Sequence, residues 1–421
     1  MIQVRNLLPG VTLRCIGDNR FKQGVFSVSF LRSMSEAEAA ANALLPAVLL
    51  RGTEKDRDMR AIIARLDDLY GAGIGALVRR IGDYQTTGFS CRFIEDRFAL
   101  PGDQVLQPLI EFVGELLFQP LTDGERFPEQ IVESEKENLI AAIESERNDK
   151  GAYAAGKLLR IMCKGDSFGI PRLGSVSQVE QLDASSLYRH YRNVLRESPV
   201  ELFYVGSASL EQVERMLSPI LEKLQTDRMT LPAQTSFRDA GGGHETEVME
   251  ISQCKLAMGF STNITNQDPD FAAMQVLNTL FGAGMTGKLF MNLREKMSLC
   301  YSIGSGYYGA KGILTVNAGI DAQKEPLVRQ EILRQLEDCR ENCFTDAELH
   351  CAKEEVLSGL RMVCDSPGAM EGFFCTAAIG GFPLTLEQYK QAVEQVSRED
   401  VCRVAGTLRL HSSFVLKGVE L

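Results

Sequence analysis

The chain has 421 residues, of which 44% are apolar and 24% charged, and its formal net charge is −11. A chain of this length exceeds one ordinary core and predicts two domains, and the apolar share is typical of a folded globular protein. The acidic balance argues against nucleic acid or an anionic membrane surface as the main partner.

The eleven cysteines are scattered and contain no CxxC pair, so we expect buried, reduced thiols rather than disulfides or a zinc ribbon. No stretch approaches 18 uncharged apolar residues, and the first residues show no signal-peptide pattern. We therefore expect a cytoplasmic protein without a membrane-spanning segment.

The first half of the chain mixes strand-like and helical patterns. Strands are expected at Val11–Cys15, Gly24–Phe30, Ala76–Ile81 and Tyr84–Phe93, and helices from Ser35 to about Leu50 and at Asp58–Tyr70. Ser35 suits the N-cap of the first helix, and Gly52 is expected to stop it.

The second half repeats this order. It offers strand-like Glu247–Phe260, a helix at Phe271–Leu280 and β runs at Cys300–Tyr308 and Gly312–Ile320. Three further pairs match: LYGAG at Leu69–Gly73 with LFGAG at Leu280–Gly284, Phe127–Glu146 with Phe344–Val363, and the closing β runs Val200–Gly206 and Ser413–Val419. A repeat of about 210 residues predicts a duplicated domain, because it is far longer than any solenoid unit.

We therefore expect an α+β fold of two homologous repeats, each a mainly antiparallel sheet flanked by helices. The N-terminal repeat is placed at residues 1–223 and the C-terminal repeat at 246–421. Residues 224–245 cluster turn formers, charges and three consecutive glycines, a composition that predicts a linker.

Four segments carry a family resemblance: ALLPAVLLRGT at Ala43–Thr53, the acidic helix around Glu135–Ile143, RLGSVSQVEQL at Arg172–Leu182 and FGAGMTGKLFMNLREKMSLCYSIGS at Phe281–Ser305. In this order and spacing they resemble the insulinase/pitrilysin family of zinc metallopeptidases over essentially the whole chain. The resemblance implies that the two repeats form a half-chamber of the processing-peptidase type.

Active members of that family carry the inverted motif His-x-x-Glu-His on a helix before a Gly-Thr pair. Two histidines one helical turn apart grip the zinc, and the glutamate between them activates its bound water. Aligned on the Gly-Thr pair at 52–53, this chain has Ala43, Pro46 and Ala47 at the three motif positions. None of these side chains binds zinc or accepts a proton.

The third zinc ligand in the family comes from a second helix. The resemblance runs through Glu135, but Ala142 stands at the ligand position seven residues on. No histidine precedes His190, so no local shift of register restores the site. We therefore expect no catalytic residue, no bound metal and no cofactor in this chain, with zinc only in a partner chain.

One family element is retained. Arg294 and Tyr301 match an Arg/Tyr pair that helps to hold the substrate backbone, so the resemblance implies that they bind peptide. The alternative is a surface Arg–Glu pair and a tyrosine packed on the sheet.

Other patterns have simpler readings. GAGMTGK at Gly282–Lys288 fits nucleotide-loop spacings, but a helical segment precedes it and Leu289 follows the lysine, so we reject nucleotide binding.

Two segments are candidate strand edges for the addition of a peptide, Phe260–Asn263 and Gly312–Asn317, although ordinary sheet strands are favoured. The acidic residues are expected on solvated helix faces: Asp67, Asp68, Glu135, Glu137, Glu144 and Glu146.

These expectations favour a non-catalytic subunit of a two-chain peptidase, which closes the chamber and helps to bind peptide for a zinc-bearing homologous partner. The partner is expected to form a heterodimer with this chain, and a homodimer is the alternative. Two other functions stay open: a stand-alone peptide-binding or scaffolding protein and, ranked lowest, an active zinc peptidase with unrecognised ligands.

Overall fold

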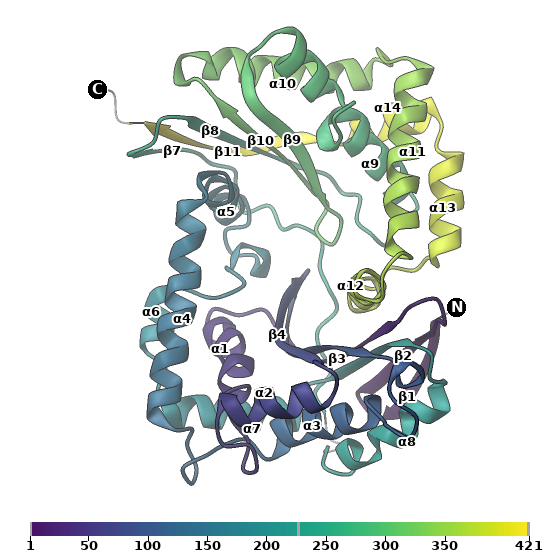
Figure 1. Cartoon of the computed structure of the whole chain (residues 1–421). Coiled ribbons are helices and arrows are strands. Elements are labelled where there is room, and N and C mark those ends of the chain that lie inside the picture. The colour runs from purple at the N-terminus through teal and green to yellow at the C-terminus, as the bar shows by residue number, and fades with distance from the viewer. Residues whose placement is uncertain (1, 225–227, 419–421) are drawn as a thin grey trace. The chain divides into compact units, whose positions relative to one another are not determined.

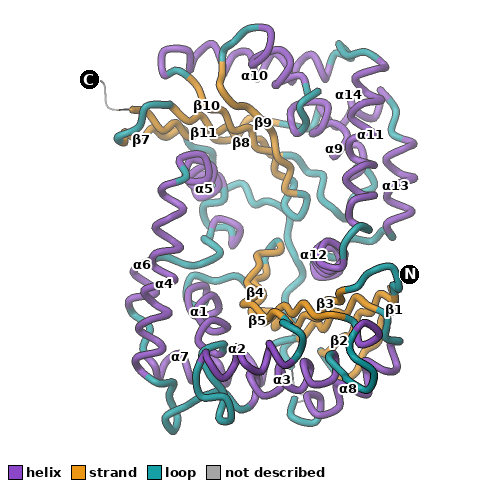
Figure 2. The backbone as a smooth tube through the Cα atoms, viewed as in Figure 1, coloured by secondary structure: helices purple, strands orange, loops and turns teal. Residues whose placement is uncertain are grey.

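The structure is a computed structural model that describes residues 2–224 and 228–418 (Figures 1 and 2). The chain forms two compact units: unit 1 is Met1–Ile143, Ile170–Ala233 and Val363–Ala377, and unit 2 is Glu144–Gly169, Gln234–Met362 and Ala378–Leu421. Each unit thus draws on both halves of the chain. The predicted boundaries at 1–223, 224–245 and 246–421 follow the sequence repeat and stay a prediction; residues 225–227 and Val419 lie outside the described residues.

Unit 1 holds a six-stranded sheet in the order β1-β2-β6-β3-β5-β4. Its strands are β1 Ile2–Leu8, β2 Val11–Gly17, β3 Gln23–Ser33, β4 Gly73–Ile81, β5 Tyr84–Ile94 and β6 Val200–Gly206. Only β2 and β6 run parallel among the described pairs, and the other neighbours are antiparallel.

Unit 2 holds a five-stranded sheet in the order β7-β11-β8-β10-β9. Its strands are β7 His244–Met249, β8 Cys254–Ser261, β9 Cys300–Tyr308, β10 Ile313–Ile320 and β11 Arg409–Gly418. With β1 set aside, the two sheets have the same strand order, and β7 with β11 is again the parallel pair. This equivalence confirms the predicted α+β fold of two repeats.

The helices flank these sheets (Figure 2). Those mainly in unit 1 are α1 Ala39–Leu49, α2 Met59–Asp68, α3 Leu106–Phe118, α4 Glu129–Asn148, α6 Val176–Glu180, α7 Ala184–Glu197, α8 Leu210–Leu221 and α12 Pro367–Ile379. Those of unit 2 are α5 Lys150–Met162, α9 Phe271–Asn278, α10 Glu325–Arg340, α11 Asp346–Val363, α13 Leu386–Gln395 and α14 Arg398–Ala405, with π-helical turns η3 Thr279–Ala283 and η4 Leu289–Lys296. Among the described residues, no helix combines the length and apolarity that crossing a bilayer requires.

Three details of the sequence prediction are wrong. The single strand predicted at Glu247–Phe260 is two strands, β7 and β8. The first helix begins at Ala39 rather than near Ser35, because the Ser35 carbonyl accepts from the N–H groups of Glu38 and Ala39 and closes a turn before the helix. The two GAG pentapeptides are also not equivalent: LYGAG follows α2 and leads into β4, whereas LFGAG lies on η3 directly after α9.

Alternation along β3 gives the sheet of unit 1 two different faces. Phe26 and Val28 belong to the apolar core, which side chains of α1, α3, α7 and α8 complete. On the other face Ser27 Oγ donates to the carboxylate of Glu371 on α12 at 2.8 Å, and Arg79 of β4 donates to both oxygens of that carboxylate at 3.0 and 2.6 Å. A helix from the C-terminal repeat therefore covers a polar face of the N-terminal sheet.

The exchange is reciprocal, because α5 of the N-terminal repeat packs on the sheet of unit 2 (Figure 1). This contact is apolar: Leu158 lies with Ala257 of β8 and Phe414 of β11 in one buried cluster. Gly259 of β8 allows the close approach, since a Cβ there would lie 2.7 Å from Met162 Sδ. The exchanged helices thus use different chemistry, polar for α12 and apolar for α5.

A buried ion pair fixes the turn between β9 and β10 in unit 2. Lys311 Nζ lies 3.0 Å from Asp166 Oδ1, and the two side chains are 0% and 2% exposed. Lys311 also donates to Thr235 Oγ1, and its carbonyl accepts from the Phe237 N–H. The pair therefore holds the chain after α5, the β9–β10 turn and the segment between the repeats together.

Candidate functional site

The three motif positions lie on α1, a helix that is almost wholly buried. Ala43 and Pro46 are buried and Ala47 is half-buried. Their methyl and pyrrolidine carbons have no lone pair for a metal. Pro46 also lines a small apolar cavity with Phe30 and Leu49. The cavity of about 10 Å³ has room for one water at most, and its lining is almost wholly apolar.

The second ligand helix is altered in the same sense. Ala142 lies exposed on α4, whereas Glu135 is buried there, so the expectation that Glu135 lies on a solvated helix face is wrong. Glu135 Oε1 accepts from the Arg51 guanidinium at 2.8 Å, and Oε2 accepts from Asn138 at 3.3 Å. The guanidinium of Arg51, two residues after α1, thus pairs with the Glu135 carboxylate.

These residues do not fit a zinc ion. A zinc site needs three or four nitrogen, sulfur or carboxylate ligands, and the family positions offer none. Across residues 2–224 and 228–418, no group of three or more His, Cys, Asp or Glu side chains is arranged to hold a metal.

The Gly-Thr pair after α1 keeps a structural role. The Gly52 carbonyl accepts from the Leu121 N–H, and Thr53 forms a bridge to Pro120. Thr53 is fully buried, and its hydroxyl accepts from the Asp56 N–H. The pair therefore anchors the end of α1 to the end of α3, with or without a metal.

A buried chain of amide hydrogen bonds holds α1 in place, and sequence reasoning missed it. Asn42, fully buried on α1, donates to Gln85 Oε1 of β5 at 2.9 Å. Its Oδ1 accepts from Nε2 of His190 on α7 at 2.7 Å, so that nitrogen carries the proton. Gln85 in turn donates to the carbonyls of Ala39 and Arg172 at 3.0 and 2.7 Å. The one polar residue within an Ala- and Leu-rich helix was the signal.

Burial shifts the titration of this cluster. Burial lowers the pKa of His190 to about 4, although the nearby Glu38 carboxylate opposes the shift. Burial also acts to raise the pKa of Glu38, but the hydrogen bonds and charge of Arg32 outweigh it and the pKa ends below its usual value. His190 is therefore neutral at pH 7 and acts as a hydrogen-bond donor within the fold.

Arg294 and Tyr301 belong to unit 2 and are both accessible. Arg294 lies on η4, its guanidinium 4.7 Å from the centre of the Phe290 ring and 3.6 Å from the Glu295 carboxylate. Tyr301, which is 64% exposed, stands at the start of β9. The arginine thus has the surface Arg–Glu contact considered from sequence, but the tyrosine is not packed away.

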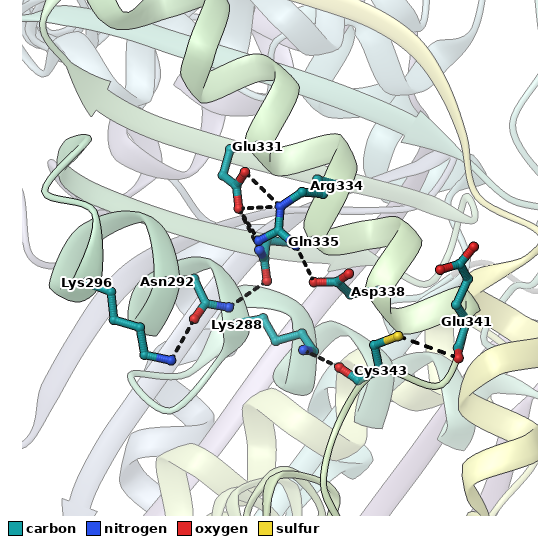
Figure 3. A network of polar contacts seen from close by, with 9 residues as sticks. All are labelled: Lys288, Asn292, Lys296, Glu331, Arg334, Gln335, Asp338, Glu341 and Cys343. Atoms are coloured by element: carbon teal, nitrogen blue, oxygen red, sulfur yellow. Dashed lines mark hydrogen bonds and ion pairs between the residues drawn. The ribbon is translucent and has the colours of Figure 1, made fainter.

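A polar network fixes η4 against α10 (Figure 3). Asn292 donates to the buried Gln335 at 2.6 Å, and Gln335 donates to Glu331 at 2.7 Å. The Lys288 ammonium, also buried, donates to the Cys343 carbonyl at 2.7 Å. This lysine holds a loop in place and is not a phosphate ligand, which agrees with the rejection of a nucleotide loop.

The strand edges differ from the two segments considered for peptide addition. Phe260 and Ser261 of β8 pair with both β10 and β11, and residues 313–317 of β10 pair with both β8 and β9, so both segments are internal. The described edge strands are β1 and β4 in unit 1 and β7 and β9 in unit 2. Strand β9, of which Tyr301 is the second residue, therefore has an edge without a strand partner among the described residues.

The fold and the altered positions define a peptidase-like protein of the zinc-metallopeptidase type that lacks the zinc ligands. Residues 181–356 match the model of the "Peptidase M16 inactive domain". The chain is thus similar to the M16 peptidases, which are the insulinase/pitrilysin family that its sequence resembles, and the matching model is that of the inactive domain.

Three similar proteins illustrate this. The "Probable inactive metalloprotease YmfF" of Bacillus subtilis is 27% identical over 98% of this chain and 96% of its own length. The "Uncharacterized zinc protease YmxG" of the same organism is 23% identical over 48% of each chain. The crystal structure of a conserved protein from Enterococcus faecalis superposes with a TM-score of 0.91 at 26% identity, covering 99% of both chains.

Proposed function

We propose that this chain is the non-catalytic subunit of a two-chain peptidase, which closes the chamber and helps to bind peptide for a zinc-bearing homologous partner. One observation carries the proposal: the zinc positions hold Ala43, Pro46 and Ala47, while Arg294 and Tyr301 remain exposed. Zinc is expected only in the partner.

A pairing of two related chains has support from the relatives. Bacillus subtilis contains both a similar protein named inactive and a similar protein named a zinc protease. If the two types work together, one chain supplies the metal and the other supplies peptide contacts. The present chain fits the second part, because Ala43, Pro46 and Ala47 offer no metal ligand and the nearby Glu135 carboxylate is paired with Arg51.

The peptide contacts would come from hydrogen-bond donors and a strand edge. A guanidinium offers five N–H donors and a phenol one O–H donor, and both suit the carbonyl oxygens of an extended peptide. Tyr301 lies at the start of edge strand β9, so a peptide paired along that edge would pass its hydroxyl. Arg294 and Tyr301 are therefore proposed as substrate-binding residues, without a part in bond cleavage.

The test mixes purified chains. The chain alone is expected to hydrolyse no peptide, and activity should exceed that of the zinc-bearing homologue of the same organism once the two are combined. Arg294→Ala should raise KM of the mixture about tenfold, the effect of one charged hydrogen bond. Arg361→Ala is the matched control, because Arg361 is an exposed arginine of unit 2 with one exposed carboxylate partner.

The outcomes separate the alternatives. No gain over the homologue alone refutes the subunit function. Peptide binding by this chain without turnover, as a monomer or homodimer, would favour a stand-alone binding protein instead. One equivalent of tightly held zinc together with chelator-sensitive cleavage would revive an active peptidase.

A further inference from the structure

A surface pocket in unit 1 lies outside all the positions discussed above. It has a volume of about 750 Å³ and is formed by α7 and the turn that precedes α4. Three guanidiniums line it, those of Arg126, Arg189 and Arg192. A pocket of this size exceeds a lone anion and falls in the range of small-molecule sites.

The three guanidiniums are uncommitted. Among the described residues, none of them forms an ion pair within 4.0 Å or donates a side-chain hydrogen bond, whereas most arginines of the chain do. Asp183, the acidic residue at the start of α7, uses its carboxylate to accept from the N–H groups of Ser185 and Ser186 and so caps the helix. The Asp183 carboxylate is not among the partners within 4.0 Å of Arg189, although the charge of Arg189 contributes to lowering the pKa of Asp183 after the hydrogen bonds of Ser186 and Ser185.

Packing holds the two walls of the pocket together. Arg189 and Arg192 lie three residues apart on α7 and therefore share one face of the helix. Arg126 directly precedes Phe127, and Phe127 is buried. The Phe127 ring packs edge-on against the rings of Tyr188 and Tyr191, with 5.6 Å between ring centres in each pair, and the Phe127 N–H donates to the Ala184 carbonyl at 3.3 Å. The three guanidiniums are therefore carried on backbone that is already fixed.

The remaining lining sets the kind of ligand. Ser185, Tyr188 and Asn193 add neutral donors on the α7 side, and the Asn193 amide is oriented because its Oδ1 accepts from Arg196 at 3.4 Å. Asp123 and Glu125 stand on the turn side and reduce the local charge to about that of one cation. Arginine forks match phosphate geometry, while the two carboxylates disfavour polyanions and accept from hydroxyl or amine groups.

We propose that this pocket binds a small phosphate monoester, with the phosphate against Arg189 and Arg192 and a hydroxyl- or amine-bearing end against Asp123 and Glu125. The proposal is independent of the peptide-binding function, because it concerns other residues. Phosphate would be recognised by paired guanidiniums, and the polar remainder of the ligand would fill the rest of the volume.

The test is calorimetric titration of the whole chain with inorganic phosphate, glycerol 3-phosphate, glycerol and heparin. Glycerol 3-phosphate is expected to bind more tightly than phosphate, and glycerol not at all. The double variant Arg189→Ala/Arg192→Ala should weaken binding at least about tenfold. Arg215→Ala on α8, an exposed arginine of the same unit, should change it less than about twofold.

Several results would overturn the proposal: no phosphate binding by the unaltered chain, equal loss in the Arg215→Ala control, or heparin binding that exceeds glycerol 3-phosphate and depends on no single arginine. The substituted side chains are exposed, so the variants are expected to fold. Far-UV circular dichroism of each variant verifies this before titration.

Discussion

The buried pair of Asp166 and Lys311 gives a sharp test of how unit 2 is held together. In the unaltered chain the Phe168 N–H donates to Asp166 Oδ1 at 2.8 Å. Asp166→Asn keeps the shape of the side chain, and its amide oxygen can still accept this hydrogen bond. The negative charge is lost, however, and the Lys311 ammonium, which is 0% exposed, loses the carboxylate that lies 3.0 Å away. The variant is therefore expected to be strongly destabilised.

Removing one partner of a buried ion pair typically costs about 3–5 kcal/mol, because the other charge stays in a poorly solvated place. The total stability of a domain is only about 5–15 kcal/mol, so this is a large share of it. With a urea slope of about 2.5 kcal/mol/M, the midpoint of unfolding should fall by about 1–2 M.

The assay is urea unfolding followed by far-UV circular dichroism, since the chain contains no tryptophan. Lys311→Met and the double variant Asp166→Asn/Lys311→Met complete a mutant cycle. The double variant should recover most of the loss, with a coupling energy of about 2 kcal/mol or more. Additive single effects, or a midpoint shift below about 0.4 M for Asp166→Asn, would show that the pair does not matter in this way.

Three further predictions concern the other features. Gly259→Ala should lower the free energy of unfolding by about 1–3 kcal/mol, because the new methyl would lie 2.7 Å from Met162 Sδ. Gly156→Ala on α5 is the control and should not lower it, because a Cβ there meets nothing within 4 Å; urea unfolding measures both. In the folded chain the pKa of His190 is about 4, whereas in the unfolded chain this histidine binds a proton below about pH 6.5. The free energy of unfolding should therefore fall, by at most about 3 kcal/mol, as the pH drops from 6.5 to 4. His190→Gln should remove this pH dependence from the urea unfolding curves. The unaltered chain should hold no stoichiometric zinc by mass spectrometry, while Ala43→His/Pro46→Glu/Ala47→His/Ala142→Glu should gain it; zinc in the unaltered chain would contradict the coordination argument.

The architecture could be predicted because both halves of the sequence carry the same order of strand and helix patterns. Periodic patterns and the ordered repeat gave two α+β units, and the strand orders agree with them. The match between LYGAG and LFGAG led to a wrong equivalence, because five similar residues do not determine topology. LYGAG follows the second helix after β3, whereas LFGAG follows the first helix after β8.

The site could be predicted only where a motif defines positions. Loss of the zinc ligands follows from residue identity alone, because the side chains of Ala43, Pro46 and Ala47 contain only carbon and hydrogen and cannot coordinate zinc. The partners of Glu135 and Asn42 were out of reach, since Arg51, Gln85 and His190 are brought to them by tertiary packing. Edge strands were missed for the same reason, because strand order does not follow chain order.

The exchanged helices change what a break in the backbone would do. The chain passes between the units at positions 143–144, 169–170, 233–234, 362–363 and 377–378, and only the third of these falls in the segment between the repeats. A protease that nicks residues 228–240 would leave two fragments that each still carry a helix of the other's unit, α5 in one and α12 in the other. Cleavage there should therefore yield a nicked particle that stays whole until denatured, and neither repeat expressed by itself should form a complete unit.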